Sequence, residues 1–459
     1  MNSFATTRLQ RGIRASGALF LTLSCVTPAA SVFILAPGVV QQAGTGAILC
    51  LLVALVVNVM IAFVYAELAS AFPLTGGEYA IVGRLLGPLP GFIVLGINFA
   101  GSILTVAVFA LGLSQYLSVL IPDLPPIAVG IGCVVVTTLS GILNIRTNAL
   151  VTGLFLLIEL VALLVLAWLG ATHISRNFAD FLTAPVNLVS DHLKPVTIAA
   201  FGLAFVNANF VYTGFGNAVY LGEEIREAPR HIGRTIIAAL LISAIAEVVP
   251  IAAVLLGAPD LSKLLSSSSM FSDFIVVRGG EGLNRLVSLG IALAIVNANI
   301  AFLVMVARQL YSISRDQVLS PVINRALMRV HPRFHSPYVA TLACGGLATL
   351  ACLIPLDFLL ILAGTGIIVI YASLCLAVFF GRRRGHLKHG HYRMPWFPWP
   401  PILGFLALGY VMVVNLGNPD FGRPSLVATA CTVFASVVYY AVALGRRGAW
   451  ILRGPDEPA

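Results

Sequence analysis

Charged side chains are scarce in this sequence. Of its 459 residues, 10% are Asp, Glu, Lys or Arg, whereas 59% are hydrophobic. Soluble domains carry about 25% charged residues, so the scarcity excludes a soluble protein and leaves no soluble domain of useful size. The net charge of +9 does not indicate nucleic-acid binding, because the basic residues are not gathered on one soluble face. The composition predicts an all-α integral membrane protein, with the lipid bilayer as its first partner.

The sequence also lacks the motifs of metal sites and of common enzymes. Its 7 cysteines lie in apolar runs without a CxxC pair or a histidine at ligand spacing, so we expect packed free thiols. HExxH, GxSxG and phosphate-loop motifs are absent. We therefore expect no metal site, no cofactor and no enzymatic activity. The absence of a soluble sensory domain and of a repeated selectivity filter disfavours a sensor and a channel.

What the sequence does contain is a series of apolar runs. A run of roughly 20 residues can cross the hydrocarbon core as a helix. With the N-terminus inside, most of the 27 lysines and arginines fall in cytoplasmic segments, which indicates about twelve transmembrane helices, an inner-membrane location and two cytoplasmic termini. The runs lie at about 17–42, 46–70, 88–120, 126–143, 148–171, 197–222, 235–257, 284–311, 338–355, 356–380, 401–416 and 424–445.

Two of the predicted helices contain residues that break helices. The first has Pro28 inside its apolar run, and the sixth has Gly214 and Gly216 on either side of Phe215. Such interruptions in corresponding positions of two halves are the best sequence indication of a transporter's binding site. Each one alone is also compatible with an ordinary kink.

Three stretches of the chain resemble the amino acid-polyamine-organocation permeases. They are residues 65–79 (YAELASAFPLTGGEY), residues 210–216 leading into Glu223 and Glu224, and residues 308–316 (RQLYSISRD). The resemblance covers nearly the whole chain. It implies the leucine-transporter-type fold, in which two inverted five-helix repeats alternate access around a central site, and a secondary active transporter of amino acids that is proton-coupled or exchanging.

The resemblance also predicts how the chain is divided. We expect a cytoplasmic N-terminus (1–16), a first five-helix repeat (17–171) and a second, inverted repeat (197–380). A basic cytoplasmic loop (381–400) would then precede two further helices (401–445) and a cytoplasmic C-terminus (446–459).

The candidate substrate-binding residues lie at the two breaks or match pocket positions of the family. After the first break, N–H groups at the start of a half-helix can bind a carboxylate. At the second break, freed carbonyl groups can accept hydrogen bonds from an ammonium group. Phe210 matches an aromatic residue that closes over the substrate in relatives, with packing as the alternative. The candidates are Thr27, Ala29, Ala30, Ser31, Asn98, Phe210, Tyr212, Thr213, Gly214 and Gly216.

Two positions depart from the family pattern. Residues 29–31 read Ala-Ala-Ser where the family typically has Gly-Ser-Gly, which keeps the backbone donors but narrows the space. Gly216 stands where many relatives carry a carboxylate or another polar side chain, so a neutral amino acid is slightly favoured. An amine or polyamine is the alternative substrate, and a membrane sensor is the alternative of a different class.

Carboxylates within the apolar runs are functional candidates by default. Glu159, deep in the fifth run, matches a position where several proton-coupled relatives carry a lysine. It is interpreted as a group that couples transport to H⁺, with a Na⁺ ligand or a neutral packing group as alternatives. Glu247 is expected to be structural or to line an outer vestibule. Glu67 and Glu78 are expected to interact with loop arginines such as Arg84.

Overall fold

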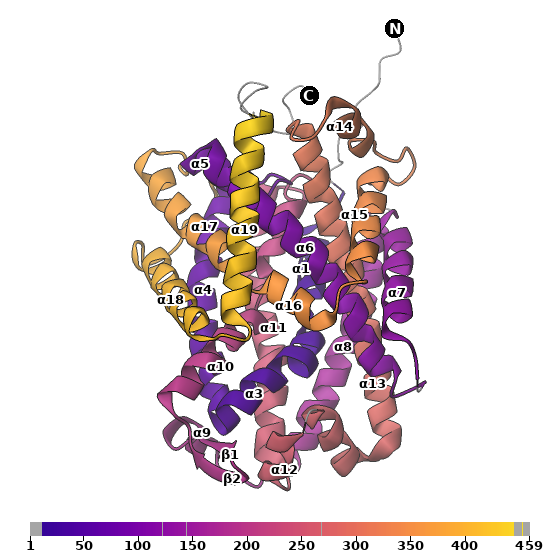
Figure 1. Ribbon diagram of the computed structural model, residues 1–459, viewed down its shortest axis with the longest axis vertical. Coiled ribbons are helices and arrows are strands. Elements are labelled where there is room, and N and C mark those ends of the chain that lie inside the picture. The colour runs from indigo at the N-terminus through magenta and orange to yellow at the C-terminus, as the bar shows by residue number, and fades with distance from the viewer. Residues whose placement is uncertain (1–11, 122, 144, 268, 445–451, 453–459) are drawn as a thin grey trace.

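The protein forms an elongated bundle of helices with one small sheet (Figure 1). The computed structural model describes residues 12–121, 123–143, 145–267, 269–444 and 452. Most of the predicted cytoplasmic termini therefore lies outside the described residues. The first half of the chain forms α1 (Ala15–Val26), α2 (Pro28–Ala30), η1 (Ser31–Leu35), α3 (Ala36–Ala43), η2 (Gly44–Gly46), α4 (Ala47–Ala71), α5 (Glu78–Leu86), α6 (Pro88–Leu117), α7 (Pro126–Gly141), α8 (Ile145–Ala171), α9 (Phe178–Thr183), β1 (Val186–Val189) and β2 (His192–Pro195).

In the described residues, the elements of the second half of the chain are all helices. Every predicted apolar run falls on helices. The second-half elements are α10 (Ile198–Val211), η3 (Phe215–Leu221), α11 (Ala228–Gly257), α12 (Leu261–Ser266), α13 (Met270–Arg315), α14 (Pro321–Leu327), α15 (Tyr338–Ala351), α16 (Leu356–Gly364), α17 (Gly366–Arg383), α18 (Trp399–Gly417), α19 (Gly422–Tyr439) and η4 (Tyr440–Leu444).

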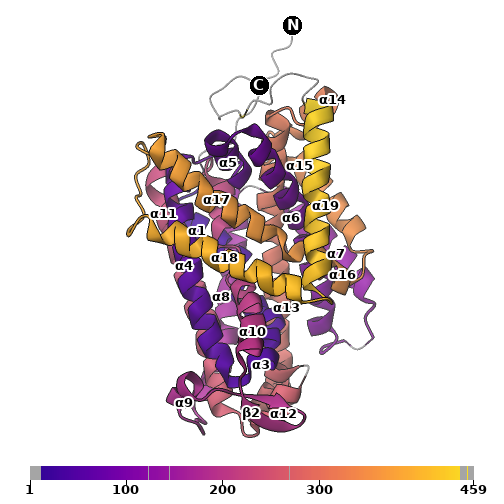
Figure 2. The same cartoon turned by 60° about the vertical axis from the view of Figure 1, so that its left-hand side comes forward.

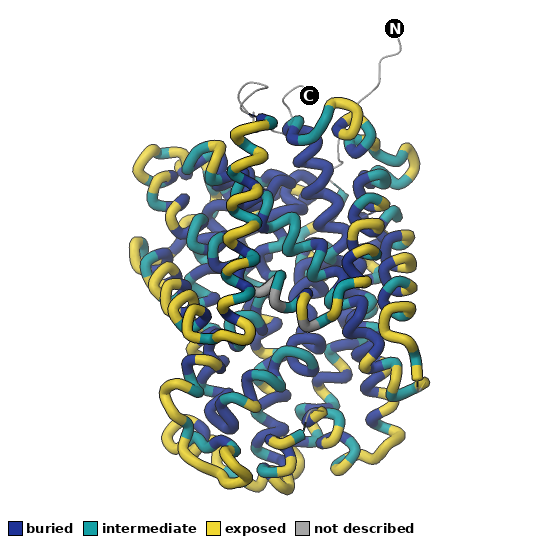
Figure 3. Tube along the Cα trace, in the orientation of Figure 1, coloured by how far each residue is buried: buried dark blue, intermediate teal, exposed yellow. Residues whose placement is uncertain are grey.

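The bundle has the lengths and surfaces of a multi-pass membrane protein. In the described residues, 9 helical stretches are long and apolar enough to span a membrane, and the first of them, Ala15–Ala71, contains α1 to α4. Buried residues fill the middle, while exposed ones lie at both ends and on outward faces (Figure 3). Large apolar side chains on those faces are strongly exposed, such as Leu150 at 75% and Phe434 at 71%. Apolar exposure of this extent fits contact with lipid.

Both predicted helix breaks are confirmed. Helix α1 ends at Thr27, whose left-handed backbone (φ 53°) redirects the chain before Pro28 begins α2. Proline suits this position because its missing N–H would have no helical partner there. Helix α10 ends at Val211, and η3 begins only after Gly214, which also has positive φ (108°). The two broken helices lie together, since α10 runs beside α3 in both views (Figures 1 and 2).

The lower end of the bundle in Figure 1 carries α9, α12 and the antiparallel hairpin β1–β2. This hairpin is bonded to the end of the first broken helix. The Val186 N–H donates to Thr45 Oγ1 (2.9 Å), and Asn187 Nδ2 donates to the carbonyls of Gln41 (3.2 Å) and Gln42 (2.7 Å). The outer strand β2 is exposed along its whole length.

Candidate substrate and coupling site

The two breaks contact each other in the interior. A Cβ atom on Gly214 would lie 2.9 Å from the carbonyl oxygen of Cys25 and 3.1 Å from Val26 Cα, so only glycine fits between the two backbones. The Ser31 hydroxyl donates to the Val211 carbonyl at 2.9 Å and so bonds the second half of the first helix to the end of α10. Conformational change at one break therefore acts directly on the other.

Two of the predicted carboxylate-binding N–H groups are already occupied. The Ala29 N–H donates to Glu159 Oε1 at 2.7 Å, and the Ser31 N–H donates to the Thr27 carbonyl at 2.9 Å. Glu159 thus places its own carboxylate at the N-terminus of the second half-helix, where negative charge is favoured. A substrate carboxylate that uses Ala29 must compete with Glu159.

The carbonyl groups of the sixth-helix break accept hydrogen bonds from the residues that follow them. The Phe210 carbonyl accepts from the Thr213 N–H (3.1 Å) and hydroxyl (2.8 Å), and the Gly214 carbonyl accepts from Asn217. Tyr212 points its phenol away from the break, toward the Leu51 carbonyl (3.1 Å) on α4. The Tyr212 side chain is therefore not directed at the break, whereas Phe210 and Thr213 are half-buried there.

Asn98 lies in a polar cluster that surrounds Glu78. Its Nδ2 donates to Glu78 Oε2 (3.1 Å), the Tyr65 phenol donates to Oε1 (3.0 Å), and the Tyr220 phenol also donates to Oε2. Burial raises the pKa of Glu78, and these hydrogen bonds oppose the rise. The expected interaction of Glu78 with Arg84 is wrong, because two phenols and an amide surround this carboxyl group.

Aromatic rings pack together beside the polar cluster around Glu78. Tyr65 lies edge-on to Phe215 (5.8 Å between ring centroids) and to Tyr371 (5.5 Å). A Cβ atom on Gly216 would come within 2.6 Å of the Tyr65 ring. Gly216 therefore packs directly against the Tyr65 ring. No carboxylate-bearing side chain fits at this position without displacing Tyr65.

A second aromatic cluster packs against the second half of the first broken helix. Phe33, in the second half of the first helix, lies edge-on to Tyr116 (6.3 Å) and Phe271 (5.7 Å). The Tyr116 phenol also donates to the Phe33 carbonyl at 3.0 Å. Each broken helix therefore has an aromatic cluster packed against it.

Ion pairs join the helices at the upper end of the bundle. Arg308 on α13 binds both carboxylate oxygens of Glu224, and each side chain is only 1% exposed. Arg315 binds Glu223 in the same two-pronged way, at 2.8 Å and 3.0 Å. Glu67 pairs with Arg382 at 2.6 Å. Arg382 belongs to the predicted basic loop (381–400), so the expected interaction with a loop arginine is confirmed, although the partner is not Arg84 and lies on the last turn of α17.

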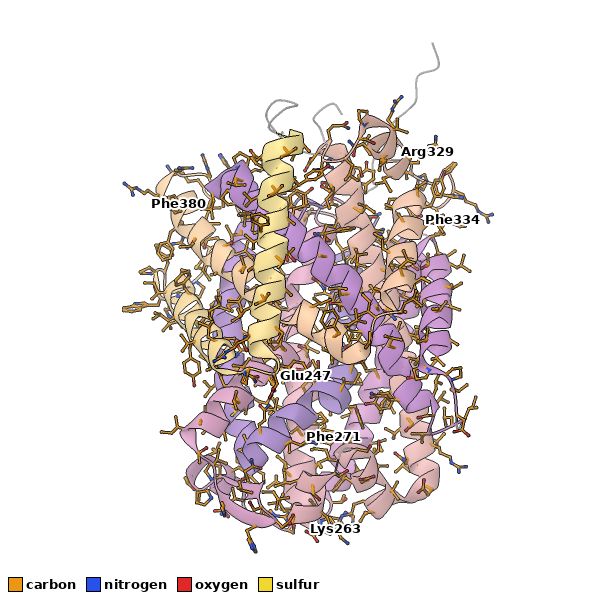
Figure 4. All side chains as sticks on the ribbon, in the orientation of Figure 1. Glu247, Lys263, Phe271, Arg329, Phe334 and Phe380 are labelled. Atoms are coloured by element: carbon orange, nitrogen blue, oxygen red, sulfur yellow. The ribbon has the colours of Figure 1, made fainter. Side chains whose placement is uncertain are left out.

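Glu247 lies at the breaks, which the sequence interpretation did not predict. Its carboxyl group is fully buried on α11 and faces the Ser31 side chain and the carboxyl group of Glu159. Figure 4 places it between Arg329 at the upper end and Lys263 at the lower end. The signal available in the sequence was a second carboxylate deep in an apolar run. The expected outer-vestibule position is wrong.

The comparisons with known proteins identify the family. The model of the amino acid permease family matches residues 15–442. The chain belongs to this family. The permease is 30% identical over 367 residues to an uncharacterized transporter of Mycobacterium tuberculosis, with 79% of each chain covered. It is 24% identical to the branched-chain amino acid permease BcaP of Bacillus subtilis, with 88% of each chain covered, and 22% identical to the methylthioribose transporter of the same organism, with 86% covered.

Family membership confirms the resemblance read from the three sequence stretches. The permease is a transporter and not an enzyme. The matched range includes both breaks, Glu159 and Glu247. The contacts described above therefore lie within the range that the family model matches.

Proposed function

We propose that the permease is a secondary active transporter that carries amino acids across the inner membrane by alternating access. The observation that carries this proposal is the contact between the two broken helices in the interior, where Ser31 bonds to the Val211 carbonyl and Gly214 packs against the backbone of Cys25. A zwitterion needs partners for both of its charges when it leaves water. Broken helices supply both kinds of partner.

We also propose the leucine-transporter-type arrangement for this fold. It would comprise about twelve crossings, two inverted five-helix repeats (17–171 and 197–380) and two further helices (401–445). The confirmed breaks in the first and sixth helical segments support it, since these are the first helices of the two repeats. In this arrangement, the end that carries α5 and α14 faces the cytoplasm (Figure 1).

The proposed substrate is a neutral amino acid. The Tyr65 ring occupies the space where a side chain on Gly216 would supply a carboxylate to a cationic substrate. The relative that is named a branched-chain amino acid permease agrees with this preference, whereas the methylthioribose transporter shows that relatives of this chain are not limited to amino acids. An amine or polyamine carrier is the second candidate, because Glu159 already occupies the Ala29 N–H.

A panel of ligands tests the substrate class. Purified permease is expected to be stabilised against heat by L-leucine and similar amino acids but not by the corresponding decarboxylated amines. A ligand that binds only the folded protein adds about 2.7 kcal/mol at 100 times its Kd, which a thermal melting assay detects readily. Equal stabilisation by the amines would mean that no carboxylate is bound, and the permease would then be an amine carrier.

The proposed coupling ion is H⁺, with Glu159 as a coupling residue. Glu159→Gln is expected to abolish the dependence of net uptake on the pH gradient, because the amide removes an ionisable carboxyl group from the breaks, while exchange of internal for external amino acid continues. Both rates are measured with radiolabelled L-leucine in proteoliposomes. Glu281→Gln, at an exposed position of α13, is the matched control. If the pH dependence of uptake is unchanged in Glu159→Gln, the role of Glu159 is structural. If uptake requires Na⁺, the coupling ion is Na⁺ and not H⁺.

A further inference from the structure

Glu247 is buried without any group that could neutralise its charge. Its side chain is 0% exposed, and in the part of the chain that the structure describes neither carboxylate oxygen has a hydrogen-bond donor or an ion-pair partner. A buried, unpaired carboxylate is so costly that such a group normally takes up a proton. Glu159 Oε2 also lacks a donor, but Oε1 is bonded to the Ala29 N–H. The two carboxyl groups thus differ in what surrounds them.

The hydrogen bonds of Ser31 indicate which carboxyl group is protonated. A serine hydroxyl has one hydrogen to donate. Ser31 directs it toward backbone carbonyls, of which Val211 at 2.9 Å is closer than Val26 at 3.4 Å. While that hydrogen is on the Val211 carbonyl, the Ser31 oxygen can only accept from a neighbouring group, and a carboxyl group can donate to it only in its protonated form.

Glu159 has the opposite environment. Its Oε1 accepts a hydrogen bond from a backbone N–H in the first turn of the second half-helix. The positive end of the helix dipole and the N–H donor both favour a carboxylate there. Two adjacent carboxyl groups in a dry interior cannot both be ionised without a large cost. One negative charge, on Glu159, satisfies all of these constraints.

The ionisable groups on the elements packed against α11 do not alter this assignment. Glu159 on α8 and Tyr212 at the sixth-helix break act on Glu247, and the Tyr212 phenol donates to Leu51. The others are bound elsewhere in the described structure, namely Cys25 (Asn217), Cys50 (Phe201), Tyr65 (Glu78), Glu67 (Arg382) and Tyr220 (Glu78).

We propose that Glu247 is the proton-binding residue of the permease, and that it shares one proton and one negative charge with Glu159. This inference rests on the proposed proton coupling. In the conformation described here, the proton lies on Glu247, which faces Ser31, and Ser31 in turn bonds to the end of α10. When the breaks separate, water reaches the carboxyl group, its O–H bond breaks, and the proton leaves as hydronium. Uptake of a proton from water reverses this step before the breaks close again.

The first test is transport by Glu247→Gln, whose amide keeps a donor for Ser31 but cannot release a proton. With L-leucine as probe and a gradient of one pH unit, one coupled proton drives about a tenfold accumulation in the unaltered permease. The variant is expected to accumulate none while still exchanging internal for external leucine. Glu281→Gln keeps the tenfold accumulation. Accumulation of leucine by Glu247→Gln to the wild-type level would overturn the inference. If accumulation were lost in Glu159→Gln but kept in Glu247→Gln, Glu159 would still be the coupling residue and Glu247 would have no part in coupling.

The second test needs neither transport nor a known substrate. Infrared spectra of the purified permease at neutral pH should contain a protonated-carboxyl band that Glu247→Gln removes and Glu159→Gln retains. If Glu247→Gln does not fold, Glu247→Asp is expected to shift the band instead. A band that survives both Glu247 substitutions unchanged would overturn the inference, even if leucine proves not to be a substrate. A Na⁺ requirement for leucine uptake, together with absence of the band, would overturn it as well.

Discussion

Replacing Arg308 by methionine is expected to cost about 3–5 kcal/mol of folded-state stability, because it leaves a buried carboxylate without its partner. Arg308 and Glu224 are each 1% exposed, and Arg308 also donates to the Val304 carbonyl at 3.0 Å. Burial raises the pKa of Glu224, and Arg308 opposes that rise. The measurements are the thermal melting temperature in detergent and the yield of monodisperse protein, both of which should fall sharply.

The double variant Arg308→Met with Glu224→Met separates charge from packing. Replacing both members of a buried ion pair by apolar residues is often close to neutral, so the double variant should regain most of the lost stability. Arg230→Met is the matched control, because this arginine also pairs with a glutamate but at the surface. The Arg230 side chain is 67% exposed and that of its partner Glu227 is 68% exposed. That change should be worth at most about 1 kcal/mol. A large loss of stability in the double variant would show that the packing of these two side chains, and not their charge, stabilises this end of the bundle.

Gly214→Ala is expected to prevent the two breaks from packing together. The residue has φ 108°, which costs a non-glycine residue about 1–3 kcal/mol. Its new Cβ would also meet the Cys25 carbonyl oxygen at 2.9 Å, and overpacking of this kind costs about 1–3 kcal/mol more. We expect leucine uptake and exchange to be lost together, with a lowered melting temperature.

Gly101→Ala on α6 is the control for this substitution. It makes the same chemical change at a helical position where a Cβ atom meets nothing within 4 Å. Its uptake and melting temperature should match those of the unaltered permease. Normal exchange by Gly214→Ala would mean that the breaks do not need to approach as closely as they do here.

The sequence predicted the features that depend on local chemistry. Proline removes a helical N–H and glycine permits positive φ, so the breaks at Pro28 and Gly214 could be recognised without knowing what surrounds them. The positions of the apolar runs follow from where apolar residues are concentrated along the sequence. Glu159 could be singled out because it lies far from either end of its run.

The features that the sequence could not predict depend on which helices meet. Glu247 was expected to be structural or to line an outer vestibule, because nothing in its own helix shows that it faces Ser31 and Glu159. Glu67 pairs with Arg382, more than three hundred residues away, because α4 lies beside α17. The direction of the Tyr212 phenol was hidden for the same reason, since its acceptor lies on α4. Neighbours between distant segments have no signature in a single sequence.

The hairpin β1–β2 determines which part of the first broken helix can move. Its bonds from Val186 and Asn187 hold the far end of α3, so a rotation about Thr27 would leave this half in place and displace α1. Strand β2, which is exposed and paired with β1, would then present an epitope that keeps its place when α1 moves. An antibody raised against it would label the permease without selecting a conformation. The exposed strand is therefore a natural fiducial site for imaging states that this conformation does not represent.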